Sequence, residues 1–296
     1  MGLESEDRVA VPGYETITVR PLAPALGAEI GGVNLASDLS TRTISEIRQA
    51  WLTHSVVFFR DQTLTSKEYL NFAQTIGEPM EYPFLRGLEE FPLITEVTKL
   101  ADETVNFGGL WHTDTAYLEE PPMATMLLGR VVPPVGGDTI WASMYAAYNA
   151  LSEGLKDLLS GLTAVNTSTL TDVSKTRQAR IQDSGYPSDL SYSAEHPVIR
   201  SHPETGQKAL YVNRAHTERF VGMTEEESRP LLQWLFAHSV RSEFTCRFRW
   251  LADSLALWDN RCTLHNPVND YHGQLRTMHR ITLAGDRPRV AAADSR

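Results

Sequence analysis

The chain has 296 residues, of which 42% are hydrophobic and 22% charged, so it is a globular protein with one large domain or two small ones. Its formal net charge of -10 argues against a nucleic-acid-binding protein, because such proteins need clustered lysines and arginines to displace counterions from phosphates. Two cysteines exclude a disulfide framework and a multi-cysteine metal site.

The first residues, MGLESEDRVAVPGYE, contain no basic stretch followed by an apolar one, so we expect no secretory signal. No apolar run approaches the roughly 18 residues that a membrane-spanning helix needs. We therefore expect a cytoplasmic protein that binds no membrane and no nucleic acid. Residues 1–14 are polar for most of their length and are expected to be flexible.

Short strands and helices alternate irregularly over the first third of the chain. Residues 16–19 and 55–60 show the alternating or β-branched patterns of strands. The segments TISE (43–46) and TSKE (65–68) both have the spacing of a capping box, so each predicts the start of a helix. Gly77 is expected to end the second helix.

Two later stretches, at about 79–110 and 167–193, lack periodicity and are predicted to be lid loops. Helices are predicted over 143–159, with a break near 152–154, and over 224–238. The remaining strands are predicted at 123–128, 198–200, 209–213, 244–250, 255–258 and 276–283. Many short strands without regular strand–helix alternation favour a mainly β fold with helices, a sandwich or jelly roll, and no linker divides residues 1–296 into two domains.

His112 and Asp114 in WHTD, together with His265, are the candidate metal ligands. On an extended chain His112 and Asp114 point to the same side, because side chains repeat with period two. Two imidazoles and one carboxylate are the facial ligand set of non-haem iron(II) oxygenases, which leaves three coordination positions open. A 2-oxo acid can occupy two of them and dioxygen the third.

His-x-Asp by itself is a weak signal, and the alternative is that His112 is a structural histidine and Asp114 a turn residue. Two arginines add support. Arg276 and Arg280 lie four residues apart on a predicted strand, so they share one face. Arginine suits the distal carboxylate of a 2-oxo acid because its planar fork donates two parallel hydrogen bonds.

The chain resembles the taurine dioxygenase (TauD/TfdA-type) group of iron(II)- and 2-oxoglutarate-dependent dioxygenases. The resemblance extends from about residue 16 to 288 and rests on a series of motifs in the order that this family shows: LGAEIGGVNL, VVFFRDQ, WHTD, PPVGGDTIWASMYAAY, EHPVIRSHPETGQKALYVN, WDNR, His265 and MHRITLAGDRP. It implies a double-stranded β-helix (jelly roll) core flanked by α-helices, and the cofactors Fe(II), 2-oxoglutarate and O2. It also implies hydroxylation of a small organic substrate with release of succinate and CO2, and a homodimer or homotetramer.

The resemblance further implies the role of each site residue. His112, Asp114 and His265 correspond to the metal ligands, and Thr139 of GGDT with Arg276 to the 2-oxoglutarate site. Among the substrate contacts of the taurine enzymes only the arginine is retained, as Arg280. The other matching positions are Tyr82, Leu85, Gly108 and His216, which replace polar or differently shaped residues.

A pocket that has lost hydrogen-bond partners for an ammonium group discriminates against taurine. We therefore expect a bulkier sulfonate, sulfate ester or carboxylate, held at Arg280 with its body against Tyr82, Phe84, Leu85 and Phe107. Two other functions remain open at this stage. A zinc metallohydrolase on the same three ligands would activate water, but it has no need for Thr139 and Arg276. A non-catalytic jelly-roll binding module would have no need for the triad.

Overall fold

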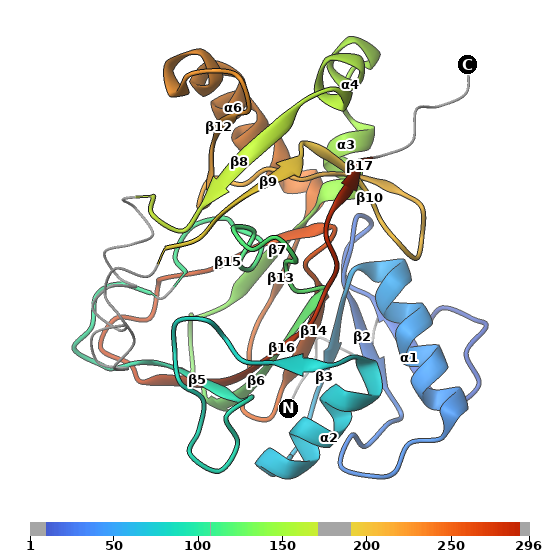
Figure 1. Cartoon of the computed structure of the whole chain (residues 1–296). Coiled ribbons are helices and arrows are strands. Elements are labelled where there is room, and N and C mark those ends of the chain that lie inside the picture. The colour runs from blue at the N-terminus through green and yellow to red at the C-terminus, as the bar shows by residue number, and fades with distance from the viewer. Residues whose placement is uncertain (1–9, 107, 171–190, 291–296) are drawn as a thin grey trace.

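A computed structural model describes residues 10–106, 108–170 and 191–290. In this part of the chain, short strands predominate and five α-helices flank them (Figure 1). The helices are α1 (Thr41–His54), α2 (Ser66–Ile76), α3 (Met144–Asn149), α4 (Glu153–Ser160) and α6 (Glu225–Ser239). The strands are β1 (Thr18–Pro21), β2 (Ala28–Gly31), β3 (Val56–Phe59), β4 (Pro79–Met80), β5 (Thr95–Lys99), β6 (Ala124–Val131), β7 (Thr139–Ser143), β8 (Thr163–Thr167), β9 (Ser193–Pro197), β10 (Ile199–Ser201), β11 (Lys208–Leu210), β12 (Thr217–Phe220), β13 (Thr245–Phe248), β14 (Leu255–Asp259), β15 (Thr263–Pro267), β16 (Arg276–Leu283) and β17 (Arg289–Val290).

The strands form one large sheet and three small ones. The large sheet has the order β1-β2-β3-β14-β6-β16-β4, and β5 also pairs with β16. One small sheet, β13-β7-β15, faces it, and the other two have the orders β12-β8-β9 and β11-β10-β17. All strand pairs are antiparallel except β2 with β3. The predicted mainly β fold with helices is confirmed.

Both faces of the large sheet are covered, which explains why all four residues of β3 are buried. Val57 and Phe59 pack in one core with residues of α1 and α2, and these two helices lie beside the sheet in Figure 1. Val56 and Phe58 point the other way, into a second core shared with β7 and β13. The space between the large sheet and the β13-β7-β15 sheet is therefore the interior of the sandwich.

The same alternation places polar side chains in that interior. Met278 belongs to the core between the sheets, whereas Ile281 belongs to the core under α1 and α2. Arg276 and Arg280 have the parity of Met278 on β16, and both are buried. The prediction that the two arginines share a face is thus confirmed, and that face is directed inward.

Helix α2 has the predicted start at Thr65, with a complete capping box to Glu68, and the predicted end at Gly77. The prediction for α1 is wrong in its start. Its N-cap is Ser40, three residues before Thr43, and Ser40 accepts a hydrogen bond from Thr43 N. The carboxylate of Glu46 instead accepts hydrogen bonds from the backbone N–H groups of residues 15 and 16.

The predicted lid at about 79–110 is not a continuous loop. Strand β5 crosses its middle and pairs with β16 from Thr95 to Lys99. Most of the second predicted lid, 171–190, and Phe107 lie outside the described residues. So do residues 1–9 of the N-terminal stretch expected to be flexible, while Val11 N donates a hydrogen bond to Val19 O.

Candidate metal and co-substrate site

The backbone brings the two candidate histidine ligands together. His112 N donates to His265 O over 3.1 Å, and His265 N donates to His112 O over 2.8 Å, so the WHTD segment pairs with β15. The possible ligand atoms of His112, Asp114 and His265 all lie within 4.8 Å of one another. Residues far apart in sequence therefore form one cluster, in the interior between the two sheets.

The tautomer of His112 follows from its backbone contact. Nδ1 lies 2.6 Å from Leu110 O, and because a carbonyl only accepts, Nδ1 carries the proton. Nε2 is the nitrogen left to face the other candidate ligands, and it lies 3.6 Å from Asp114 Oδ1. Gly108 packs on the same ring, since a Cβ built there would lie 3.1 Å from His112 Cε1, and its φ of +72° also favours glycine.

The carboxylate of Asp114 is buried but strongly stabilised as an anion. Burial alone would raise its pKa, but Arg280, whose Nη2 lies 3.0 Å from Oδ1, and His265 hold the pKa well below its usual range. The other oxygen, Oδ2, accepts a hydrogen bond of 2.6 Å from Thr125 Oγ1. Asp114 is therefore ionised at neutral pH, as a metal ligand must be.

His265 is the second imidazole. Burial and the neighbouring His112 hold its pKa well below the usual value, so the ring is neutral at neutral pH. Its ring lies 4.1 Å from the ring of His112, measured between centroids, and packs against Trp141 and Trp258. Two imidazoles and one carboxylate are the donor set that iron(II) prefers in such sites.

Arg276 is a buried cation that forms no ion pair within the described residues, and Asp138 is the carboxylate whose charge acts on it. Only 6% of it is exposed, and neither Nε nor Nη2 has a hydrogen-bond partner among the described residues. Burial lowers its pKa, and its guanidinium lies beside the rings of Trp250 and Tyr271. A buried guanidinium with open donors is costly unless an anion joins it, so this position fits a carboxylate.

Thr139 is prepared to be a second donor to such a carboxylate. Its Oγ1 accepts a hydrogen bond of 2.9 Å from Trp250 Nε1, and because indole N–H only donates, the proton of the hydroxyl remains available. Thr139 begins β7 directly after a tight turn. Gly137 in that turn has φ +72°, and a Cβ there would lie 3.4 Å from the side chain of Arg276.

One cavity of about 60 Å³ joins these groups, and seven of the ten predicted site residues line it: Gly108, His112, Asp114, Thr139, His265, Arg276 and Arg280. The other three lie close by. The ring of Tyr82 lies 4.6 Å from the guanidinium of Arg280, and the ring of His216 lies 6.1 Å from that of His112. Leu85 packs on an aromatic cluster of Tyr82, Phe84 and Tyr117.

Sequence reasoning missed two buried polar residues next to the site. Thr125, on β6, donates to Asp114, and Lys99, on β5, is opposite Arg276 in register with its Nζ 4.4 Å from the ring centre of Tyr271. Thr125 could have been identified from the sequence, because a threonine between apolar neighbours on a buried strand is unusual. Lys99 carries no comparable signal, because lysine in a loop-like stretch is ordinarily exposed.

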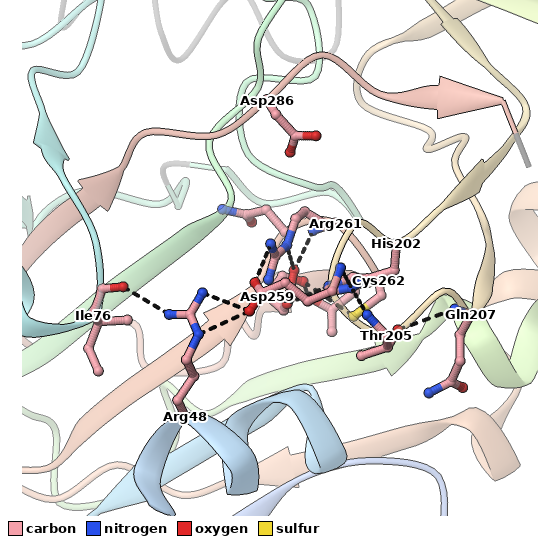
Figure 2. Close-up of polar contacts among 12 residues, drawn as sticks. Arg48, Ile76, His202, Thr205, Gln207, Asp259, Arg261, Cys262 and Asp286 are labelled. Atoms are coloured by element: carbon pink, nitrogen blue, oxygen red, sulfur yellow. Dashed lines mark hydrogen bonds and ion pairs between the residues drawn. The ribbon is translucent and has the colours of Figure 1, made fainter. Parts of the chain in front are cut away.

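A second group of potential ligands, His202, Asp259 and Cys262, is an ion-pair network (Figure 2). Nε2 of His202 lies 3.0 Å from Asp259 Oδ2, and Nδ1 accepts from the backbone N–H groups of residues 204 and 205, so both nitrogens are used. Arg261 donates to both oxygens of Asp259. This network ties the turn between β14 and β15 to the hairpin of β10 and β11, and Glu204 extends it to Arg48 on α1.

Residues 18–282 match the model of the taurine catabolism dioxygenase TauD, TfdA family. The chain belongs to this family. It is 37% identical over 279 residues to an alpha-ketoglutarate-dependent sulfate ester dioxygenase of Pseudomonas putida, which covers 92% of this chain and 91% of that protein. It is 34% identical to an alkylsulfatase of Acinetobacter baylyi, over 92% of this chain and 86% of that protein.

Solved structures agree with the family assignment. A putative alpha-ketoglutarate-dependent taurine dioxygenase from Burkholderia xenovorans is similar with a TM-score of 0.80 and 38% identity, covering 92% of this chain and 94% of the other. This TauD/TfdA-type protein is thus a 2-oxoglutarate-dependent dioxygenase with a jelly-roll core, which uses Fe(II), 2-oxoglutarate and O2 and acts on small molecules. Among its described residues, no helix is long and apolar enough to cross a membrane.

Proposed function

We propose that His112, Asp114 and His265 hold Fe(II), and that Arg276 and Thr139 bind the distal carboxylate of 2-oxoglutarate. The enzyme hydroxylates a small anionic organic substrate and releases succinate and CO2. One observation carries this proposal: the cavity lined by the three ligands also contains a buried arginine with open donors. A zinc hydrolase would have no use for that arginine, so the oxygenase is favoured over the hydrolase.

The protein residues contribute binding, orientation and exclusion of water. His265 is neutral and Asp114 is ionised, so neither needs to lose a proton at neutral pH, and the backbone contact of His112 Nδ1 leaves its Nε2 facing Asp114. Bound iron(II) supplies the redox chemistry that activates dioxygen, which no side chain of this cavity can supply. Three protein ligands leave room for a chelating 2-oxo acid and for dioxygen.

The substrate anion is proposed to bind at Arg280, next to the metal site, since Nη2 of Arg280 lies 3.0 Å from Asp114 Oδ1. Apolar surface surrounds this cation: Tyr82 stacks on it, and Phe84, Tyr117 and Leu85 continue the wall. His216 lies against Tyr117, 4.9 Å between ring centroids, and Gly108 packs so closely on His112 that a Cβ there would lie 3.1 Å from Cε1. These features fit an anionic head with an apolar body, hence an organic sulfate ester, sulfonate or carboxylate larger than taurine.

A succinate-release screen tests the proposal. Purified protein with Fe(II), 2-oxoglutarate and O2 should form succinate in proportion to a substrate chosen from alkyl sulfates, alkyl sulfonates and aryloxy acids. Without oxygen, Fe(II) and 2-oxoglutarate should produce a weak visible charge-transfer band. Folded protein that gives neither the band nor coupled succinate would contradict the proposed site.

We also propose that residues 1–296 act as one domain, that the protein is cytoplasmic, and that it assembles as a homodimer or homotetramer. Continuous strand pairing from β1 to β16 supports one domain, and the two buried cysteines, which form no disulfide, are compatible with a reducing compartment. Light scattering coupled to gel filtration tests the assembly.

A further inference from the structure

The two carboxylate oxygens of Asp114 have different surroundings. Oδ1 is the oxygen that faces the other candidate ligands, since it lies 3.6 Å from His112 Nε2, and it also forms an ion pair with Arg280, whose Nη2 lies 3.0 Å away. Oδ2 is occupied by Thr125, whose hydroxyl donates over 2.6 Å. The two oxygens are therefore distinguished by the protein before any metal binds.

The direction of this hydrogen bond is determined by a chain of donors. Indole N–H only donates, so the 3.0 Å contact from Trp258 Nε1 identifies its partner as the amide oxygen of Asn260. The amide nitrogen of Asn260 then faces Thr125 Oγ1 at 2.9 Å and donates to it. Because the hydroxyl has one proton and accepts from Asn260, its proton goes to Asp114.

These linked hydrogen bonds are buried, and Asn260, which lies in the middle, makes further contacts. Trp258, Asn260 and Thr125 are each 2% exposed or less, so water cannot replace a lost contact. The backbone carbonyl of Asn260 accepts a hydrogen bond of 2.7 Å from Thr113 Oγ1, which joins the turn to the WHTD segment. Asp259 and Arg261, the two sequence neighbours of Asn260, belong to the ion-pair network with His202 shown in Figure 2.

We propose that Trp258, Asn260 and Thr125 are positioning residues that select Oδ1 of Asp114 as the metal-binding oxygen and hold Oδ2 away from the metal. This inference rests on the proposed metal site. Partners of this kind orient metal ligands, and their loss lowers metal affinity about 10- to 100-fold. If Oδ2 loses its hydrogen bond from Thr125, the carboxylate of Asp114 can rotate. Both the metal affinity and the geometry of the metal ligands then change.

The test is metal binding by metal-free protein, without 2-oxoglutarate or substrate, using Co(II) as the probe. Thr125→Val preserves side-chain shape and removes the donor, so we expect about 10- to 100-fold weaker Co(II) binding and an altered visible absorption spectrum. Thr125→Ser retains the hydroxyl and should bind Co(II) with the affinity and the visible spectrum of the wild type. Asn260→Asp should resemble Thr125→Val although Thr125 is present, because a carboxylate at 260 accepts the threonine proton.

Ser239→Ala is the matched control, since it removes a buried hydroxyl that donates to a backbone carbonyl, Leu235 O, on α6. It should leave the Co(II) affinity and spectrum unchanged. Wild-type affinity and spectrum in both Thr125→Val and Asn260→Asp would overturn the inference, as would failure of Thr125→Ser to restore them. If Thr125→Val does not fold, Asn260→Asp with Thr125→Ser decides. Wild-type protein that binds no Co(II) or Fe(II) would instead contradict the proposed metal site itself.

Discussion

At the scale of single residues, the candidate site stands out because polar and charged side chains are buried together around one cavity. Arg276 is the strongest case, since its open donors face a cavity that also holds three potential metal ligands. Period-two alternation predicted from the sequence that Arg276 shares a face with Arg280. The pairing of Arg280 with Asp114 could not be predicted, because it depends on how β16 and the WHTD segment meet across the sandwich.

Replacing Arg276 should separate binding of 2-oxoglutarate from binding of simpler 2-oxo acids. In Arg276→Ala we expect about 100-fold weaker binding of 2-oxoglutarate, because its distal carboxylate loses a charged, bidentate partner. Binding of 2-oxobutyrate, which has no distal carboxylate, should change little. Anaerobic calorimetry with Mn(II)-loaded protein measures both. Arg249→Ala, at an exposed arginine, is the control, and unchanged 2-oxoglutarate affinity in Arg276→Ala would contradict the assignment.

At the scale of elements, two similar capping-box spacings had different outcomes. TSKE (65–68) caps α2 as predicted, because the side chains of Thr65 and Glu68 hydrogen-bond to each other and to each other's backbone N–H groups. TISE (43–46) does not, because Ser40 provides an earlier cap and Glu46 binds backbone N–H groups of residues 15 and 16. A local pattern cannot show that a carboxylate has a tertiary partner, and that limits sequence prediction of helix starts.

The assignment of Ser40 as the cap of α1 predicts a specific loss of stability. Ser40→Ala removes the acceptor for Thr43 N and should lower the free energy of unfolding by about 1 kcal/mol. Ser40→Asp keeps an acceptor and should retain most of the stability. Urea denaturation followed by circular dichroism measures the difference. A denaturation midpoint in Ser40→Ala equal to that of the wild type would show that the helix does not depend on this cap.

At the scale of the whole molecule, the fold class and the order of the site motifs were predictable, whereas strand partners were not. β15 (Thr263–Pro267) was missed as a strand because Asn266 and Pro267 interrupt its pattern. It forms because β7 on one side and the His112 backbone on the other provide hydrogen bonds. The hydrogen bonds that link Trp258, Asn260 and Thr125 could not be predicted either, because they join β14, the following turn and β6.

The stability of the whole domain should depend on pH through His196 on β9. This side chain is 1% exposed, and its Nε2 lies 2.9 Å from Leu118 O. Burial lowers its pKa from 6.5 to about 4. Between these values the unfolded chain binds a proton that the folded protein does not, so the free energy of unfolding falls as the pH falls from 6.5 to 4.

His196→Gln keeps a donor for Leu118 O and removes the titration. Between pH 7 and pH 4 the wild type should therefore lose about 3 kcal/mol more stability than this variant does. Urea unfolding at several pH values measures the difference. His272→Gln, at an exposed histidine, should follow the wild type. Parallel pH dependences for wild type and His196→Gln would mean that His196 becomes protonated without unfolding, and that its burial does not exclude the charged form.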